Sequence, residues 1–150
     1  MKIASNLPQQ RACLDVIEEG IISGGYSGVL KAVYEDESLK QSVFEDVEKI
    51  CPAHCILASG TSGIDLNVIG KNTRSQDRIV GAHFFSPAHV MPLMEIVRTE
   101  KTSKQVIFDL MTVGKTIKKV PILVGNCTGF AANRTFFPYE LGAYIYSWLT

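Results

Sequence analysis

The sequence has no excess of charge of either sign and no long hydrophobic run. Its 150 residues include 15 lysines and arginines and 15 aspartates and glutamates, so the formal net charge is +0 at pH 7. Nucleic acids and acidic membrane surfaces attract a positive field, which this chain does not supply. The longest uncharged apolar stretch near a terminus, 141–150, is much shorter than the roughly 20 residues that a membrane span needs. We therefore predict neither nucleic acid binding nor membrane insertion.

Cysteines are few, and their spacing does not form a metal-binding motif. Four are present, and the sequence CPAHC places Cys51, His54 and Cys55 close together. A structural zinc ion needs four ligands, usually in two separated pairs, and a second pair is missing here. The pattern therefore favours reduced thiols in a reducing compartment, and we predict no metal.

Size and apolar content set the scale of the fold. With 46% apolar residues, a chain of this length can form one compact domain with a buried core, or a part of one. The N-terminal sequence MKIASNLPQQRACLD contains no apolar core of the signal-peptide kind. We therefore expect a soluble intracellular domain.

Strand-like and helix-like segments alternate from residue 29 onward. Apolar runs of strand length lie at 29–35, 54–59, 78–85, 92–98 and 120–125. Helical spacing of apolar residues is found at 6–19, 37–50, 65–71 and 102–117. Thr102 and Gln105 form a T-x-x-Q capping box at the start of the last of these helices. The alternation predicts a layered α/β fold.

Two of the strand-like runs carry one titratable residue each within otherwise apolar sequence. His83 lies in the run at 78–85, and Glu95 lies in the run at 92–98. If the two runs are neighbouring strands, the imidazole and the carboxylate come within hydrogen-bonding distance, as a general base near neutral pH requires. The alternative is a core histidine together with an acid at a strand end that faces water. Spacing alone leaves both interpretations open.

Three blocks of the sequence resemble one enzyme family in their order and separation. They are ILASGTSGIDL at 56–66, HFFSPAHVMPLMEIV at 83–97 and NCTGFAANR at 126–134. Together they resemble 3-hydroxyacyl-CoA dehydrogenases, and in particular the dehydrogenase part of plant peroxisomal multifunctional proteins of fatty acid β-oxidation. The resemblance implies NAD-dependent oxidation of 3-hydroxyacyl-CoA to 3-oxoacyl-CoA in the peroxisome. The chain does not end in S-K-L, so this location depends on the resemblance alone.

The same resemblance implies a division of the chain into three parts. Residues 1–31 are similar to the end of an enoyl-CoA hydratase part, 32–125 to the distal part of a Rossmann-like NAD-binding domain, and 126–150 to the start of an all-α C-terminal domain. The expected fold is therefore α/β, an incomplete Rossmann-like NAD-binding domain followed by the start of a helical one. The aromatic segment 144–149 predicts association with another chain or with further sequence.

The resemblance also implies roles at the site. His83 would take the hydroxyl proton of the acyl-CoA substrate while hydride leaves C3 for the nicotinamide, and Glu95 would orient His83 and stabilise its imidazolium. Ser62 and Asn133 match positions that donate hydrogen bonds to the substrate oxygen. From the residues alone, Ser62 equally fits a cap of the helix that starts near Ile64, and Asn133 equally fits a polar residue on a helix surface.

Further residues match family positions that line the NAD cofactor. They are Glu35, Lys40, Ser62 and Ser86. Of these, Lys40 equally fits a solvated helix residue. His54 and His89 match no position of this kind, and we expect both in loops.

The sequence departs from the family at the turn that binds pyrophosphate. A dinucleotide-binding domain opens with a strand and a G-x-G turn, yet no two of the twelve glycines are separated by a single residue. Gly60 and Gly63 also replace side chains beside Ser62, and Ser86 stands where many members have asparagine. These departures keep a second hypothesis open, a catalytically inactive fragment that binds acyl-CoA or an intact subunit.

Overall fold

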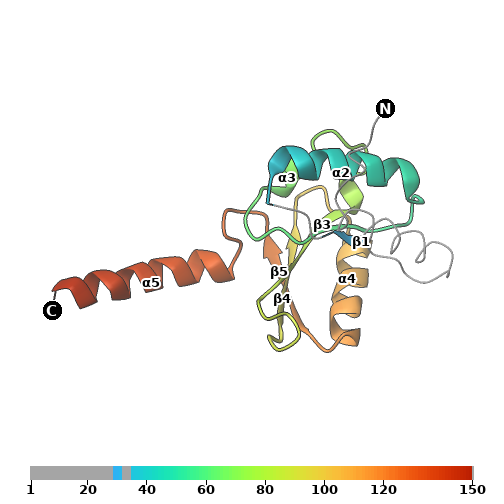
Figure 1. Ribbon diagram of the computed structural model, residues 1–150. Helices are drawn as coiled ribbons and strands as arrows, with labels where there is room; N and C mark the ends of the chain where they lie inside the picture. Colours follow the sequence, from blue (N-terminus) through green and yellow to red (C-terminus); the bar gives the residue numbers. More distant parts are fainter. Residues whose placement is uncertain (1–28, 32–34, 150) are drawn as a thin grey trace.

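The computed structural model describes residues 29–31 and 35–149 (Figure 1). Its strands are β1 (Val29–Lys31), β2 (Leu57–Ser59), β3 (Ile79–Phe84), β4 (Leu93–Arg98) and β5 (Val120–Gly125). Its helices are α2 (Glu37–Ile50), α3 (Leu66–Ile69), α4 (Lys104–Thr116) and α5 (Ala132–Leu149), with a 3-10 turn, η1, at Gln76–Arg78. Each segment predicted beyond residue 28 has its counterpart, whereas the helix predicted at 6–19 lies outside the described residues.

The strands form one sheet in the order β1-β2-β3-β4-β5. β1, β2 and β3 are parallel, β4 runs antiparallel to β3, and β5 is parallel to β4. The reversal at β4 follows from the sequence, because the short segment 85–92 joins β3 to β4 and a parallel connection needs about a dozen residues or more. The carboxyl ends of β1, β2 and β3 therefore share one edge of the sheet.

Helices cover both faces of this sheet, which confirms the α/β prediction. α2 and α3 pack on one face, and α4 packs on the other (Figure 1). Burial of each large apolar side chain between these layers contributes roughly 1.5–3 kcal/mol. The layer under α2 and α3 is built mainly from Val43, Phe44, Val47, Leu57, Leu66, Ile69 and Ile79.

Ser103, and not Thr102, caps α4. The Ser103 hydroxyl accepts a hydrogen bond from the Val106 amide at 3.3 Å. The buried Thr102 hydroxyl instead accepts from the Thr99 amide at 3.0 Å and donates to the Ile79 carbonyl at 2.8 Å. The predicted capping box is therefore wrong, because the Thr102 side chain links the end of β4 to the start of β3.

α5 extends away from the sheet as a long helix (Figure 1). It contains no buried residue and continues through Pro138, which lacks the N–H that would bond the carbonyl four residues back. Among the residues that the structure describes, none of the helices combines the length and the apolar character needed to cross a membrane. The exposed apolar side chains of α5 are Phe136, Phe137, Tyr139, Leu141, Tyr144, Ile145, Tyr146, Trp148 and Leu149.

Candidate active site

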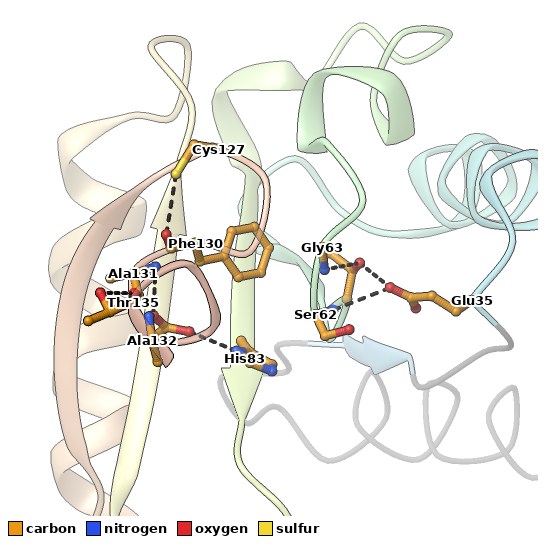
Figure 2. Close-up of polar contacts among 11 residues, drawn as sticks. Glu35, Ser62, Gly63, His83, Cys127, Phe130, Ala131, Ala132 and Thr135 are labelled. Carbon is orange, nitrogen blue, oxygen red and sulfur yellow. Dashed lines mark hydrogen bonds and ion pairs between the residues drawn. The ribbon is translucent and has the colours of Figure 1, made fainter. Parts of the chain in front are cut away.

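His83 and Glu95 lie directly opposite each other on the paired strands β3 and β4. Residues two apart on a strand share a face, so both side chains lie on the α2 and α3 side of the sheet, the side of Ile79 and Val97. The Nδ1 atom of His83 is 2.8 Å from Oε2 of Glu95 (Figure 2). His83 is 7% exposed and Glu95 is 0% exposed. Glu95 is therefore not an acid that faces water, and the two side chains form a buried hydrogen-bonded pair.

The carboxylate fixes the tautomer of the imidazole. A carboxylate only accepts hydrogen bonds, so the contact with Glu95 places a proton on Nδ1 of His83. In a neutral imidazole the other nitrogen, Nε2, then has a free lone pair. His83 is consequently arranged to accept a proton at Nε2.

The second carboxylate oxygen of Glu95 binds the start of α5. Oε1 accepts hydrogen bonds from the amides of Ala131 at 3.0 Å and Ala132 at 2.9 Å (Figure 2). Backbone N–H groups at a helix N-terminus are unpaired within the helix and carry a partial positive charge. These donors compensate the burial of the carboxylate and connect α5 to the His83–Glu95 pair.

Two phenyl rings flank the imidazole of His83. The ring centroid of Phe85 lies 4.7 Å from that of His83, and the centroid of Phe130 lies 5.7 Å from it in an edge arrangement. Phe130 is 1% exposed. These two rings place apolar surface against the imidazole.

Glu35 and Thr61 hold the loop that carries Ser62. The Thr61 hydroxyl donates to Oε1 of Glu35, and the Ser62 amide reaches the same oxygen at 3.3 Å (Figure 2). Thr61 also accepts from the Ile64 amide at 2.9 Å. Ser62 itself is exposed, and Asp65, whose carboxylate accepts from an amide of the first turn, caps α3. The alternative in which Ser62 caps this helix is therefore wrong.

Lys40 is buried and paired with Glu35. Its Nζ atom lies 2.8 Å from Oε2 of Glu35, with the Lys40 side chain 2% exposed and the Glu35 side chain 45% exposed. Burial alone would raise the pKa of Glu35, but hydrogen bonds from Lys40 and Thr61 and the charge of Lys40 outweigh it, so this pKa lies below its usual range. Lys40 is thus not a solvated helix residue.

The remaining candidate residues lie near these two clusters without joining them. Ser86 is exposed in the loop after β3, and Asn133 is half-buried in the first turn of α5. Within the described part of the chain, neither side chain is hydrogen-bonded to His83 or to Glu35. His54 and His89 are exposed outside helices and strands.

The sequence patterns predict no role for Thr61, Phe130 or the amides of Ala131 and Ala132, although all of them contact the site. Backbone amides carry no signal in a sequence, and a phenylalanine in an apolar block is indistinguishable from an ordinary core residue. Each of these residues nevertheless lies in one of the blocks at 56–66 and 126–134. Their position inside these blocks is the signal that could have found them.

No group of three or more histidine, cysteine or acidic side chains that could hold a metal ion occurs among the residues described. In the CPAHC segment, Cys51 and Cys55 are buried free thiols, and His54 is exposed. Burial and the neighbouring Cys55 thiol raise the pKa of Cys51. Since the thiolate is the metal ligand and the nucleophile, the Cys51 thiol is suited to packing.

Parallel strands, helices on both faces and polar side chains beyond the strand ends define the class of a Rossmann-like domain. Residues 22–127 match the family model described as 3-hydroxyacyl-CoA dehydrogenase, NAD binding domain. The chain belongs to this family. The resemblance carried by the three sequence blocks and the expected Rossmann-like fold are confirmed.

The curated plant relatives are much longer than this chain. It is 71% identical over 117 residues to the peroxisomal fatty acid beta-oxidation multifunctional protein of Oryza sativa subsp. japonica, covering 78% of this chain and 16% of that protein. It is 70% identical over 115 residues to the corresponding protein MFP2 of Arabidopsis thaliana, covering 77% of this chain and 16% of that protein. The crystal structure of M. tuberculosis FadB2 is similar with a TM-score of 0.75 and 25% identity, covering 90% of this chain and 56% of that one. The chain thus spans 16% of the length of these curated plant relatives.

NAD is the cofactor of this family, and the described residues lack the cradle for its pyrophosphate. Such domains hold pyrophosphate at a glycine-rich turn before a helix N-terminus. The helices that follow β1 and β2 are α2 and α3, and their N-cap residues are Asp36 and Asp65. Both carboxylates would repel a phosphate. The described part of the chain therefore offers no fit for the pyrophosphate at these two helices.

Proposed function

We propose that the chain carries the acid–base pair of a 3-hydroxyacyl-CoA dehydrogenase, which oxidises 3-hydroxyacyl-CoA to 3-oxoacyl-CoA. The buried hydrogen bond of 2.8 Å between His83 and Glu95 is the observation that supports this most. The plant relatives are named as peroxisomal fatty acid beta-oxidation multifunctional proteins. Their names support peroxisomal fatty acid β-oxidation as the setting of the reaction.

His83 acts as the general base in this proposal. Its Nε2 atom accepts the proton of the 3-hydroxyl group, and the imidazolium that forms lies against the Glu95 carboxylate. Glu95 is held by two backbone amides, so it stabilises the imidazolium without having to reorient. A positioned base of this kind contributes roughly 10²–10⁴-fold to a rate.

The other candidate residues have supporting roles in the same proposal. Ser62 and Asn133 donate hydrogen bonds to the substrate oxygen, where negative charge increases as its proton leaves. Glu35, Ser62 and Ser86 would line the cofactor, and Lys40 would act there through Glu35, because its ammonium is buried against that carboxylate. When bound, NAD supplies the acceptor for the hydride that leaves C3 of the substrate.

The division of the chain follows from the same family assignment. We propose that residues 1–31 are a hydratase-like tail, that 32–125 are the distal part of the NAD-binding domain, and that 126–150 begin a helical C-terminal domain. The exposed apolar surface of α5 supports the last of these, since such a surface is normally covered by protein.

Turnover of acetoacetyl-CoA with NADH tests the proposed activity in the reductive direction. The purified chain is expected to oxidise NADH, measured as the fall in its absorbance, and His83→Ala is expected to lower the rate about 100-fold or more. His89→Ala is the matched control, because His89 is an exposed loop histidine, and it should leave the rate unchanged. Equal rates for the chain with and without His83 would refute the role of this residue.

A second candidate function is supported by the missing G-x-G turn and by the aspartate caps of α2 and α3. It is an inactive fragment that binds acyl-CoA or pairs with an intact subunit. Calorimetric titration with acetoacetyl-CoA in the absence of NADH separates the two functions. Binding without any NADH oxidation supports the fragment, and NADH oxidation by the purified chain excludes it.

A further inference from the structure

Phe130 has a backbone conformation that bulky residues avoid. Its φ is +49°, and it follows Gly129, whose φ is +73°. The left-handed region is sterically unfavourable for a residue with a Cβ atom. Lys118 is the other non-glycine residue with positive φ in the described part of the chain, and of the two only Phe130 is buried. Strain at a buried position persists only where the surrounding contacts compensate for it.

The contacts of the Phe130 ring provide this compensation. The ring meets the imidazole of His83 in an edge arrangement, with 5.7 Å between centroids and 64° between planes, which is favourable for an aromatic pair. It also belongs to the buried apolar cluster that includes Val97 of β4. Figure 2 shows the ring beside His83, at the turn between Cys127 and the start of α5.

The backbone of the same turn serves Glu95. The Phe130 amide donates to the Cys127 carbonyl at 2.9 Å and closes the turn. The next two amides, those of Ala131 and Ala132, then both reach Oε1 of Glu95. Because Phe130 directly precedes them, its left-handed φ determines the direction in which these N–H groups point.

We propose that Phe130 is a positioning residue of the site. Its ring fixes the imidazole of His83, and its turn aims the two alanine amides at Glu95. This inference rests on the proposed role of His83 as the base. Without the ring, the imidazole gains freedom to rotate and water reaches its edge, so that water replaces Glu95 as the partner of Nδ1 and the proton populates Nε2.

The test measures which ring nitrogen of His83 carries the proton. Long-range ¹H–¹⁵N spectra of the full chain, labelled with ¹⁵N-histidine, are recorded at a pH at which the imidazole is neutral. The His83 signals are assigned by their absence from His83→Gln. The unmodified chain is expected to show mainly the Nδ1–H tautomer. In Phe130→Ala the Nε2–H population should rise about two- to tenfold, the change that loss of one aromatic pair allows.

Two further variants keep the test decisive. Phe130→Leu retains apolar bulk and provides the test if Phe130→Ala does not fold. Its Nε2–H population of His83 is expected to rise less than in Phe130→Ala. Lys118→Gly relieves the other positive φ, at an exposed residue in the turn between α4 and β5, and should leave the His83 signals unchanged. If the folded Phe130 variants keep the tautomer population of the unmodified chain, the proposal is overturned.

The tautomer measurement does not need turnover. A chain that fails to oxidise NADH would remove the proposed function and leave the tautomer test of Phe130 intact. In an active chain, Phe130→Ala should lower kcat more than it raises KM for acetoacetyl-CoA, because the ring contacts His83 and is assigned no contact with the substrate. A change confined to KM would contradict the positioning role.

Discussion

Glu95 and Glu35 are the two acids of the site, and they differ in how much they depend on their partners. Glu95 is 0% exposed, and its oxygens accept hydrogen bonds from His83, Ala131 and Ala132. Leaving a buried charge without its partner costs roughly 3–5 kcal/mol. Glu35 is half in water, so its own charge is partly solvated, and here it is the buried Lys40 that depends on the pair.

Removal of Glu35 should therefore destabilise the fold more than removal of Lys40. Glu35→Ala leaves the ammonium of Lys40 buried without its carboxylate partner, and we expect the free energy of unfolding to fall by roughly 2–3 kcal/mol. This is below the cost for a wholly buried pair, because half of the Glu35 side chain is in water. Lys40→Met should cost less, since Glu35 can then be solvated. Urea unfolding followed by circular dichroism measures both.

The double variant Glu35→Ala with Lys40→Met is the control for this pair. It removes the buried charge together with its partner, so part of the stability lost in Glu35→Ala should return. If the stability lost in the double variant equals the sum of the losses in the two single variants, Lys40 does not depend on Glu35.

Acid should weaken the fold through Glu35. Its pKa in the folded chain lies below the usual value of 4.5, so the ionised carboxylate stabilises the fold above that value. The contribution is lost as the pH falls below 4.5 and through the folded-state pKa. The unfolding midpoint in urea should fall more steeply over this acid range for the unmodified chain than for Glu35→Gln. Other acids with a lowered pKa are common to both proteins, so identical slopes would exclude a contribution from Glu35.

Among the elements, β3 and β4 depend on a close approach at Gly81. Gly81 is paired with Val97, and a Cβ atom added to Gly81 would lie 2.7 Å from the Cβ of Val97 and 3.5 Å from Cδ1 of Leu66. His83 lies two residues after Gly81 on β3, and its partner Glu95 lies two residues before Val97 on the antiparallel strand β4. A separation of the two strands that relieves the contact at Gly81 would therefore also displace the proposed acid–base pair.

Gly81→Ala should lower the free energy of unfolding by about 1–3 kcal/mol, because extra volume in a packed core forces side chains or strands apart. Turnover should fall with it if the two strands move. Gly125→Ala is the matched control, since Gly125 lies at the end of β5 with nothing within 4 Å of an added Cβ. Chemical denaturation of both variants gives the comparison, and an unaffected Gly81→Ala would contradict the tight contact between β3 and β4.

Local patterns in the sequence predict these elements well and their contacts less well. The helix at 37–50 and the strands at 78–85 and 92–98 follow from apolar periodicity, whereas this pattern leaves open whether His83 and Glu95 meet, and the strand register places them opposite each other. The cap of α4 cannot be predicted this way, because the hydroxyl of the preceding threonine is bound to a distant strand. The contact of Glu35 with Thr61 joins residues 26 positions apart, and no local pattern encodes it.

At the scale of the whole molecule, α5 is the α-helix that buries none of its residues in the part of the chain that the structure describes. Its apolar side chains occupy all sides of the helix, and none of its residues is buried. A helix that is apolar all round is normally enclosed by other protein. Trp148 is 89% exposed and Leu149 is 81% exposed. The end of α5 is therefore expected to pack against another apolar surface, such as α5 of a second copy of the chain.

The chain should therefore self-associate through α5. Trp148→Gln combined with Leu149→Gln is expected to lower the average mass measured by light scattering after size exclusion at high protein concentration. The free energy of unfolding in dilute solution should stay within about 0.5 kcal/mol of the unmodified value, because α5 buries none of its side chains. Phe108→Gln is the control, since Phe108 is 67% exposed on α4 and its replacement should leave the mass unchanged. A monomeric unmodified chain at all concentrations would refute association through this helix.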